Sequence, residues 1–269
     1  MSKRIDAYLV EKGYAKSRER AKNLIKSGGV YINSAAVSKP SEAVSEGDTV
    51  TVTISDLKYV GRGALKLEKA FEAFDINVTG MVCADIGAST GGFTEVLLEK
   101  GAEKVYAVDV GHGQLDKKLQ NNSRVVNCEG TNARELTSDH FSEAVDFFSV
   151  DVSFISLKHI MNALSDCSAY GCIFAVLIKP QFEAGREKVG KKGVVRDPAV
   201  HREVIEMVTA YAQSISFAPC HLEFSPIKGP EGNIEYLVHL VRLPDGVTEE
   251  ETNVDVDAVV KSAHDTLDK

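Results

Sequence analysis

A glycine-rich stretch near residue 90 is the part of the sequence best suited to bind a ligand. Residues 85–94 read Asp-Ile-Gly-Ala-Ser-Thr-Gly-Gly-Phe-Thr, and they follow the apolar run 81–84 and precede apolar residues at helical spacing. The glycines therefore lie where a buried strand turns into a helix, where the backbone can approach a ligand and the new helix presents free N–H groups. Asp109 closes the next apolar run, 105–108. A carboxylate there can accept both ribose hydroxyls of an adenosine ligand.

The spacing of these glycines argues against a nicotinamide dinucleotide. The usual Gly-x-Gly-x-x-Gly is absent, because Gly87 is followed by Ala-Ser-Thr-Gly-Gly. Taken alone, the turn is also typical of any tight strand-to-helix connection in a doubly wound domain. Read with its neighbours, it resembles the cofactor loop of methyltransferases that use S-adenosylmethionine. More narrowly, nearly the whole chain resembles the hemolysin/TlyA-type ribosomal RNA 2′-O-methyltransferases, relatives of the FtsJ-type RNA methyltransferases. The resemblance implies a set of residues that bind S-adenosylmethionine: Asp85, Gly87, Ser89, Gly91, Gly92, Phe93, Asp109, Thr131 and Asn132.

Alternating strand-like and helix-like segments predict an α/β fold. A helix is expected at 64–74, and after the glycine-rich loop the strands are 105–108, 125–128, 145–150 and 172–178, separated mostly by helix-length segments. The last two strands, 217–224 and 236–241, are separated by only about a dozen residues rich in Pro and Gly. So short a connection cannot carry a crossover helix, so these strands should form an antiparallel hairpin. The expected fold is a Rossmann-like methyltransferase with a mostly parallel seven-stranded sheet that ends in this hairpin.

The amino-terminal part of the chain is basic although the whole chain is acidic. Residues 1–27 hold eight Lys and Arg against three Asp and Glu, so they carry a net +5, and the rest of the chain carries −13 of a total of −8. Helices are expected at 4–12 and 18–26, with strands at 30–33 and 49–52. From charge alone, a solvated helix face and an RNA-binding face are both open.

The run from Ser17 to Gly28, with Val30 and Asn33, resembles the small α+β RNA-binding domain first described in ribosomal small-subunit protein four. The resemblance implies that RNA is bound by basic side chains of this module and of the segment that follows it: Arg4, Lys16, Arg18, Arg20, Lys22, Lys26 and Arg62. The expected domain organisation is an RNA-binding domain at 1–54, a linker at 55–60, a methyltransferase domain at 61–245 and an acidic, helical segment at 246–269.

The residues after the fourth strand bear on which atom accepts the methyl group. An enzyme that methylates a base nitrogen should show an Asn/Asp-Pro-Pro-aromatic run there, but residues 151–157 read Asp-Val-Ser-Phe-Ile-Ser-Leu. A pyrimidine C5 enzyme needs a nucleophilic cysteine, commonly in a Pro-Cys pair at the fourth or fifth strand. The chain has one Pro-Cys pair, Pro219-Cys220, and it lies in the terminal hairpin. These absences favour a ribose 2′-hydroxyl, a poor acid that needs cations or a lysine able to take its proton.

The resemblance to FtsJ-type enzymes then groups four charged residues that spacing alone could not have chosen. Lys66, Asp151, Lys179 and Glu235 match in order the Lys-Asp-Lys-Glu tetrad of that family. Lys179 would activate the 2′-oxygen, Asp151 would orient it, and Lys66 and Glu235 would hold the ribose and its proton network. Considered singly, each is typical of a surface or helix-cap charge. His201 is expected to face outward on a helix capped by Asp197.

Composition limits the remaining possibilities. The chain has 269 residues and five cysteines without a C-x-x-C pair, so we expect reduced thiols and no metal centre. No apolar run approaches the ~18 residues that span a bilayer, and no signal sequence opens the chain, which predicts a cytoplasmic protein without a membrane partner. Ribosomal RNA or ribosomal subunits are the expected partners, and the sequence does not predict an oligomeric state. An RNA base methyltransferase, a ribosome-binding assembly factor and, given the family's older name, a membrane-lytic protein remain as alternatives.

Overall fold

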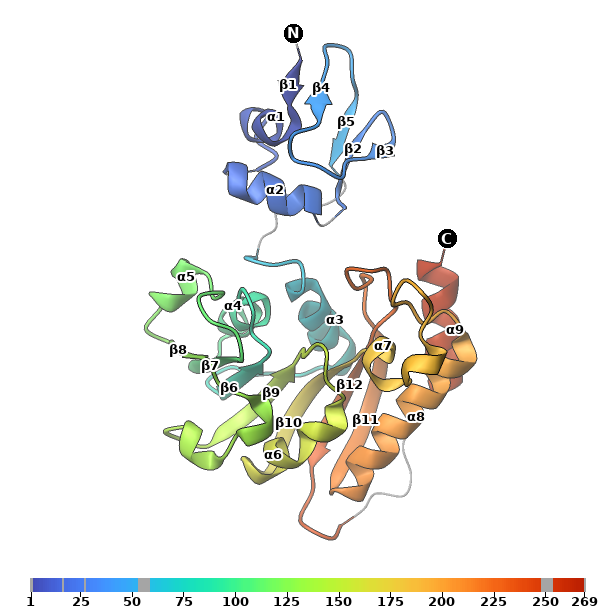
Figure 1. Ribbon diagram of the computed structural model, residues 1–269. Coiled ribbons are helices and arrows are strands. Elements are labelled where there is room, and N and C mark those ends of the chain that lie inside the picture. The colour runs from blue at the N-terminus through green and yellow to red at the C-terminus, as the bar shows by residue number, and fades with distance from the viewer. Residues whose placement is uncertain (1, 16, 27, 53–58, 248–253, 269) are drawn as a thin grey trace. The chain divides into compact units, whose positions relative to one another are not determined.

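The chain divides into two units, Met1–Arg62 and Gly63–Lys269, in the computed structural model (Figure 1). The structure describes residues 2–15, 17–26, 28–52, 59–247 and 254–268. Most of the linker expected at 55–60 therefore lies outside the described residues. Tyr59, the first described residue after the gap at 53–58, is buried.

The first unit is a small α+β module. Its elements are β1 (Lys3–Arg4), α1 (Ile5–Glu11), α2 (Arg18–Lys26), β2 (Val30–Ile32), β3 (Ala35–Ala36), β4 (Ala43–Val44) and β5 (Val50–Val52). Strand β2 pairs antiparallel with β3 and β5, and β1 pairs with β4. Ile5 and Leu9 of α1 pack with Leu24 and Ile25 of α2 in one buried cluster, at the helical spacing that the sequence predicts.

The second unit is built on a seven-stranded sheet in the order β11-β12-β10-β9-β6-β7-β8. The strands are β6 (Val82–Ile86), β7 (Lys104–Asp109), β8 (Val125–Glu129), β9 (Val145–Val150), β10 (Ser168–Ile178), β11 (Phe217–Phe224) and β12 (Tyr236–Arg242). The first five are parallel to one another, whereas β12 runs antiparallel to both β10 and β11. The predicted methyltransferase sheet with its antiparallel hairpin is confirmed.

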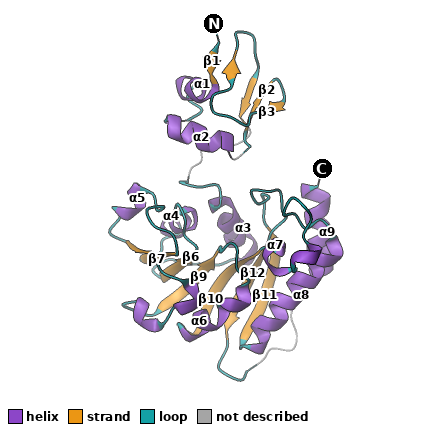
Figure 2. Cartoon of the chain, viewed as in Figure 1, coloured by secondary structure: helices purple, strands orange, loops and turns teal. Residues whose placement is uncertain are grey.

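Helices cover both faces of this sheet (Figure 2). They are α3 (Ala64–Phe74), α4 (Gly92–Glu99), α5 (Lys117–Gln120), α6 (Met161–Asp166), α7 (Pro180–Glu183), α8 (Pro198–Ser214) and α9 (Val256–Leu267). Helix α3 contacts α4, β11 and β12, while α6 contacts β10 and α8 contacts β11 and α9. The chain order reverses between β6 and β9, which are neighbours in the sheet, and the crevice at such a switch point is where α/β folds bind ligands.

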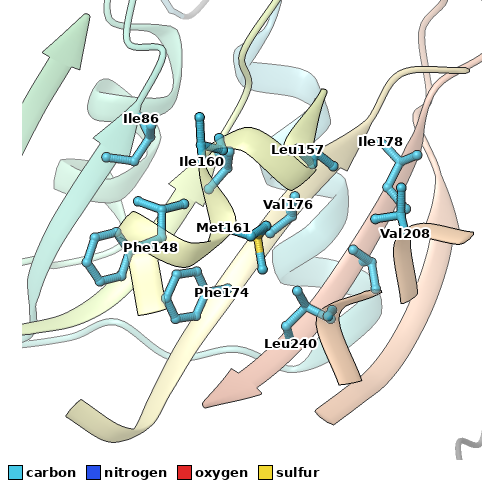
Figure 3. Close-up of a cluster of buried hydrophobic side chains, with 14 of the residues drawn as sticks. Ile86, Phe148, Leu157, Ile160, Met161, Phe174, Val176, Ile178, Val208 and Leu240 are labelled. Atoms are coloured by element: carbon cyan, nitrogen blue, oxygen red, sulfur yellow. The ribbon is translucent and has the colours of Figure 1, made fainter. Parts of the chain in front are cut away.

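The larger core lies between the sheet and the layer of α6 and α8 (Figure 3). Phe148 and Phe174 from neighbouring strands stack with ring centroids 4.7 Å apart, and Met161 of α6 and Val208 of α8 belong to the same buried cluster. Burying each such side chain stabilises the fold by roughly 1.5–3 kcal/mol. This rigid layer fixes the carboxyl ends of the strands, from which the site is built.

Two local expectations differ from the structure. Strand β10 begins at Ser168 and not at residue 172, because the segment after Ser168 shifts register and extends the strand with exposed residues that break the apolar pattern. His201 is fully buried and does not face outward. It lies one helical turn before Val204 and Ile205, on the stripe of α8 that also holds Val208, so the apolar spacing of the helix already indicated its burial.

Candidate active site

The glycine-rich loop connects β6 to α4 and brings the backbone close to the neighbouring strand. The amide groups of Gly87 and Ala88 donate to the carbonyl oxygen of Val108, at 2.8 and 3.0 Å. Gly87 has a φ of 89°, and a Cβ there would lie 2.4 Å from the carbonyl oxygen of Asp151. Only glycine fits both the backbone angle and this approach. The loop after β6 and the loop after β9 are therefore in direct contact.

Asp109, at the end of β7, holds the other side of this loop. Its two carboxylate oxygens accept the amide hydrogens of Ser89 and Gly111, at 2.8 and 2.7 Å. Oδ1 also accepts from Gln114 Nε2 at 3.4 Å, whereas Oδ2 retains a lone pair, so the carboxylate can still accept a hydroxyl group from a ligand. Asp109 thus orders the loop and presents an acceptor at the same time.

A cavity of about 490 Å³, which we call the cofactor cavity, opens beside these groups. Apolar side chains of Val108, Val110, Val152 and Ile160 form part of its wall. The predicted cofactor residues Gly87, Ser89, Asp109, Thr131 and Asn132 all line it. Apolar walls with a few polar groups at one end suit an adenosyl group, whose base is flat and whose ribose carries two hydroxyls.

The other predicted cofactor residues do not line this cavity. Asp85 is fully buried, where its carboxylate accepts hydrogen bonds from Thr94 Oγ1 at 2.7 Å and Ser149 Oγ at 3.2 Å. Burial raises the pKa of Asp85 to about 7. Gly91 has a left-handed backbone, and a Cβ there would lie 2.2 Å from Leu119 Cδ1. Gly92 and Phe93 are buried in the first turn of α4. Together with Asp85 and Gly91 they stabilise the conformation of the glycine-rich loop.

Four charged side chains converge at the edge of the sheet where β9, β10 and β12 meet α3. Lys66 Nζ lies 2.7 Å from Glu235 Oε2 and 3.4 Å from Asp151 Oδ2. Lys179 Nζ lies 2.5 Å from Asp151 Oδ1 and donates to Ser153 Oγ at 2.8 Å. The charges therefore alternate in a row, Glu235, Lys66, Asp151 and Lys179, which we call the tetrad.

Burial makes the charges of this row depend on one another. The side chain of Glu235 is 1% exposed, and those of Lys66 and Lys179 are 9% and 8% exposed. Burial alone would lower the pKa of Lys66, but the carboxylates of Asp151 and Glu235 outweigh burial and raise it. Burial would likewise raise the pKa of Asp151, but Lys66 and Lys179 outweigh burial and lower it. Lys66 and Asp151 are thus held in their charged forms.

A second cavity, also of about 490 Å³, contains the tetrad, and we call it the acceptor cavity. All four tetrad residues line it. It shares five lining residues with the cofactor cavity: Gly87, Ser89, Asp151, Ser153 and Phe154. The two cavities therefore meet at Asp151, so that a group bound in one can reach a group bound in the other.

Sequence reasoning missed three residues at this junction. Ser153 accepts the hydrogen bond from Lys179, and Asn233 is a buried amide in the wall of the acceptor cavity. Phe154 is 90% exposed and has a φ of 63°, an unusual conformation for an aromatic residue. Its ring lies 5.1 Å from that of Phe182. An aromatic residue three positions after a strand-ending Asp was a usable signal, because it lies at the edge of the sheet that binds ligands.

A buried network supports the acceptor cavity from the carboxy-terminal side. His201 Nε2 donates to the carbonyl oxygen of Val195 at 3.0 Å, and Nδ1 lies 2.8 Å from Tyr236 Oη and 3.2 Å from His264 Nε2 of α9. Burial lowers the pKa of His201, which keeps the ring neutral. Asp268, just after α9, binds His264 Nδ1 at 2.8 Å and Lys228 Nζ at 2.6 Å. Helix α9 is thereby connected to the strand and the loop on either side of Glu235.

The predicted RNA-binding residues of the first unit are only partly described. Arg4 and Arg18 are about half exposed, and both bind the buried carboxylate of Asp6, at 3.1 and 3.0 Å. The bond from Arg4 is the main cause that lowers the pKa of Asp6 to about 2. Arg20 Nη1 donates to the carbonyl oxygen of Tyr59 at 3.5 Å, Lys22 is exposed on α2, and Arg62 is half-buried. Lys16 and the side chain of Lys26 lie outside the described residues.

The fold and the site together define the class of this protein. A Rossmann-like sheet with a terminal antiparallel hairpin, a glycine turn at the switch point and an acceptor carboxylate after the next strand are the features of a methyltransferase that uses S-adenosylmethionine as its methyl donor. The chain belongs to the FtsJ-like methyltransferase family, whose model matches residues 59–242, and an S4 domain matches residues 3–50. The resemblance stated from the sequence is confirmed.

Relatives and solved structures are similar over most of the chain. The 16S/23S rRNA (cytidine-2'-O)-methyltransferase TlyA of Mycobacterium tuberculosis is 46% identical over 88% of this chain and 89% of its own. Hemolysin A of Brachyspira hyodysenteriae is 41% identical over 88% of this chain and 99% of its own. A solved structure from Streptococcus thermophilus that carries a hemolysin name is 42% identical, with a TM-score of 0.79 over 99% of this chain and 97% of that one.

Within the residues that the structure describes, no helix combines the length and the apolar composition needed to cross a bilayer.

Proposed function

We propose that this protein methylates a ribose 2′-hydroxyl of ribosomal RNA. The observation that carries the proposal is the junction of the two cavities. The cofactor cavity and the acceptor cavity share Asp151 and Ser153, and the ion-paired lysines Lys66 and Lys179 lie on the acceptor side of that junction. A hydroxyl group bound there is within reach both of a bound methyl donor and of a lysine that can activate it.

S-adenosylmethionine, when bound, supplies a methyl group on a sulfonium sulfur, which is already electrophilic. Gly87, Ser89 and Asp109 would hold its adenosyl part in the cofactor cavity, together with Thr131 and Asn132. The protein must then place an oxygen lone pair on line with the methyl carbon, which is chiefly a matter of positioning.

The tetrad supplies the acid–base part of the reaction. Lys179 is assigned to activate the 2′-hydroxyl. Once its ammonium has passed a proton to water, the neutral amine takes the hydroxyl proton as the oxygen–methyl bond forms and the methyl–sulfur bond of the donor breaks, which releases S-adenosylhomocysteine. Asp151 holds Lys179 through a 2.5 Å ion pair and orients the hydroxyl, while Lys66 and Glu235 fix Asp151 from the other side. Because Lys66 lies between two carboxylates, the row resists displacement when a ribose enters the acceptor cavity.

The surroundings of Asp151 support ribose more than a base as acceptor. A base-nitrogen acceptor is usually held by a polar side chain beside proline residues, whereas here a charged row of lysines and carboxylates faces the cavity. Phe154 lies at the mouth of both cavities with its ring exposed, so it offers a stacking surface for the base attached to that ribose. The ribosomal substrate is supported by the S4 domain match and by the name of the TlyA relative. We propose assembled ribosomal subunits as the form in which the RNA is presented.

The test uses S-adenosylmethionine carrying a tritiated methyl group, with bacterial 16S and 23S ribosomal RNA offered both free and in purified subunits. Lys179→Ala should reduce methyl transfer by roughly 10²–10⁴-fold while the affinity for S-adenosylmethionine stays unchanged, because the lysine acts on the acceptor oxygen. Lys179→Arg should not restore activity, since guanidinium does not give up its proton. Lys69→Ala is the matched control, as Lys69 is on the same domain and, among the residues that the structure describes, pairs with Glu223 alone, at 3.5 Å.

The product identifies the acceptor atom. A 2′-O-methyl nucleotide makes the adjoining linkage resistant to alkali, because the neighbouring hydroxyl can no longer attack the phosphate. Label recovered on a base after nuclease digestion would overturn the ribose assignment. A fully active Lys179→Ala protein would remove Lys179 from the reaction.

A further inference from the structure

A strongly basic segment borders the acceptor cavity. Between α7 and α8, residues 185–196 read Gly-Arg-Glu-Lys-Val-Gly-Lys-Lys-Gly-Val-Val-Arg. This segment, which we call the cationic turn, has five basic residues against one acid, in a chain whose net charge is −8. All five basic residues are exposed: Arg186, Lys188, Lys191, Lys192 and Arg196. Because the chain as a whole is acidic, this local excess of positive charge indicates a surface that binds an anionic partner.

The backbone of the cationic turn is closed on itself. Gly193 N donates to the carbonyl oxygen of Gly190 at 2.8 Å, and Gly190 N donates to that of Val194 at 3.1 Å. Lys191 and Lys192 therefore occupy the two central positions of a closed four-residue turn. Their side chains leave the turn from a fixed backbone.

Hydrogen bonds also attach the cationic turn to the wall of the acceptor cavity. The buried amide of Asn233 donates from Nδ2 to the carbonyl oxygen of Gly193 at 2.9 Å and accepts from Val195 N at 3.0 Å. His201 holds the carbonyl oxygen of Val195 from the other side, at 3.0 Å. Gly193 and Asn233 both line the acceptor cavity, so the turn begins where that cavity ends. An anion bound by the turn would thus have a defined position relative to the tetrad.

Most of these cations have no acidic partner among the described residues. Lys188 pairs with Glu203, but within the described part of the chain the side chains of Lys191, Lys192 and Arg196 take part in no ion pair. Together with Lys188 these three side chains line a hollow of about 350 Å³, which is also lined by Asp197, whose carboxylate accepts from Ala199 N in the first turn of α8 at 2.9 Å. A neighbouring hollow of about 310 Å³ is lined by Arg186, and it shares Gln181 and Phe182 with the acceptor cavity.

From this arrangement we propose that the cationic turn binds the phosphodiester backbone of the acceptor RNA on the flank of the nucleotide that enters the acceptor cavity. The inference rests on the proposed function, since it assumes that the acceptor is a nucleotide within an RNA strand. A strand that continues past Phe182 or past Gly193 meets one of the two hollows, where lysine and arginine can contact successive phosphates. Such contacts position the strand without reading its sequence, which suits a site whose chemistry acts on the ribose.

The test compares two proteins with the same change in net charge. In the first, Lys191, Lys192 and Arg196 are all replaced by Gln. In the second, the exposed residues Lys100, Lys117 and Lys261, which line none of the cavities described above, are replaced by Gln. Binding of transcribed bacterial 23S ribosomal RNA is measured by fluorescence anisotropy from 50 to 300 mM KCl, without S-adenosylmethionine. Methyl transfer is then measured over a range of concentrations of RNA presented in purified ribosomal subunits.

The first protein should bind RNA about 10–30-fold more weakly, with a slope of log affinity against log salt reduced by about 2, as expected for three lost phosphate contacts. Its KM for RNA should rise while kcat at saturating RNA stays within about twofold, because the tetrad is untouched. Equal salt slopes in the two triple variants would overturn the proposal, as would a lower kcat with unchanged RNA affinity. Since RNA binding is measured without turnover, a wild-type protein that fails to methylate would sink the proposed function and leave the comparison of slopes intact.

Discussion

Replacing Lys66 with Met tests whether the tetrad is a buried ion network. Lys66 Nζ lies 2.7 Å from Glu235 and 3.4 Å from Asp151. At the effective dielectric constant of about 20 that describes partly buried sites, the two attractions amount to about 6 and about 5 kcal/mol before the cost of desolvation. Asp151 keeps Lys179 as a partner in the variant, but among the described residues Lys66 is the only cation within ion-pair distance of Glu235. The change therefore leaves one carboxylate buried without a counter-ion.

Leaving a buried charge unpaired typically costs about 3–5 kcal/mol, so Lys66→Met should lower the free energy of unfolding by this amount at pH 8. Lys69→Met is the matched control, since that side chain is 33% exposed and pairs with Glu223 at 3.5 Å, and it should cost about 0.5 kcal/mol or less. The free energies are measured by urea denaturation at pH 8.

The decisive comparison is the double variant Lys66→Met with Glu235→Met. Removing both partners of a buried pair is often nearly neutral, so this protein should recover at least about 2 kcal/mol relative to the single variant while methyl transfer stays abolished. A single variant that costs less than about 1 kcal/mol, or a double variant less stable than the single, would refute the buried network.

Four further outcomes are expected, three for single substitutions and one for a deletion. Asp109→Ala should weaken binding of S-adenosylmethionine by about 10–100-fold through loss of charge-assisted hydrogen bonds, as measured by calorimetry; unchanged affinity would remove this carboxylate from the site. Deleting residues 1–62 should leave cofactor affinity intact but flatten the salt dependence of RNA binding. Burial, with His221 as a second cause, lowers the folded pKa of His239 to about 4, so its contribution to stability is full above pH 6.5 and falls as the pH drops. In urea denaturation, the change in stability between pH 7.5 and 5 should be less favourable for the wild-type protein than for His239→Gln by about 2 kcal/mol, since the comparison cancels the other titrating groups. Asp268→Ala should lower kcat by about tenfold without a change in cofactor affinity, because it removes the ion pair that holds Lys228 and the loop before Glu235. Asp265→Ala, near the end of the same helix, should leave kcat unchanged.

The backbone architecture could be predicted because it depends on local properties of the chain. Apolar periodicity identified the seven strands of the sheet, and the short connection between β11 and β12 required an antiparallel hairpin. Glycines with positive φ at Gly87 and Gly91 marked a tight turn that no other residue fits. These features are set by backbone geometry and by the reach of a few residues, so they can be read without knowing the rest of the fold.

The grouping of the tetrad could not be predicted in this way. Lys66, Asp151, Lys179 and Glu235 come from α3 and from the ends of three strands, and they meet only because the strand order places β9, β10 and β12 side by side. No local pattern encodes that order. From the sequence the set was reached by resemblance to a family, and the ion pairs and the shared wall of the two cavities were found only in the structure.

The sequence by itself determined where the ligand-binding loop, the basic module and the strands lie, because spacing and residue type are enough for these. Tertiary structure alone decided which side chains reach the cavities. Asp85, which is predicted to bind the cofactor, is buried and accepts a hydrogen bond from Thr94 of α4. His201, which is predicted to face outward, lies in a buried network. Phe154 was unremarked in the chain but stands exposed at the mouth of both cavities. The direction of a side chain depends on what packs behind it, and that is a property of the whole fold and not of the neighbouring residues.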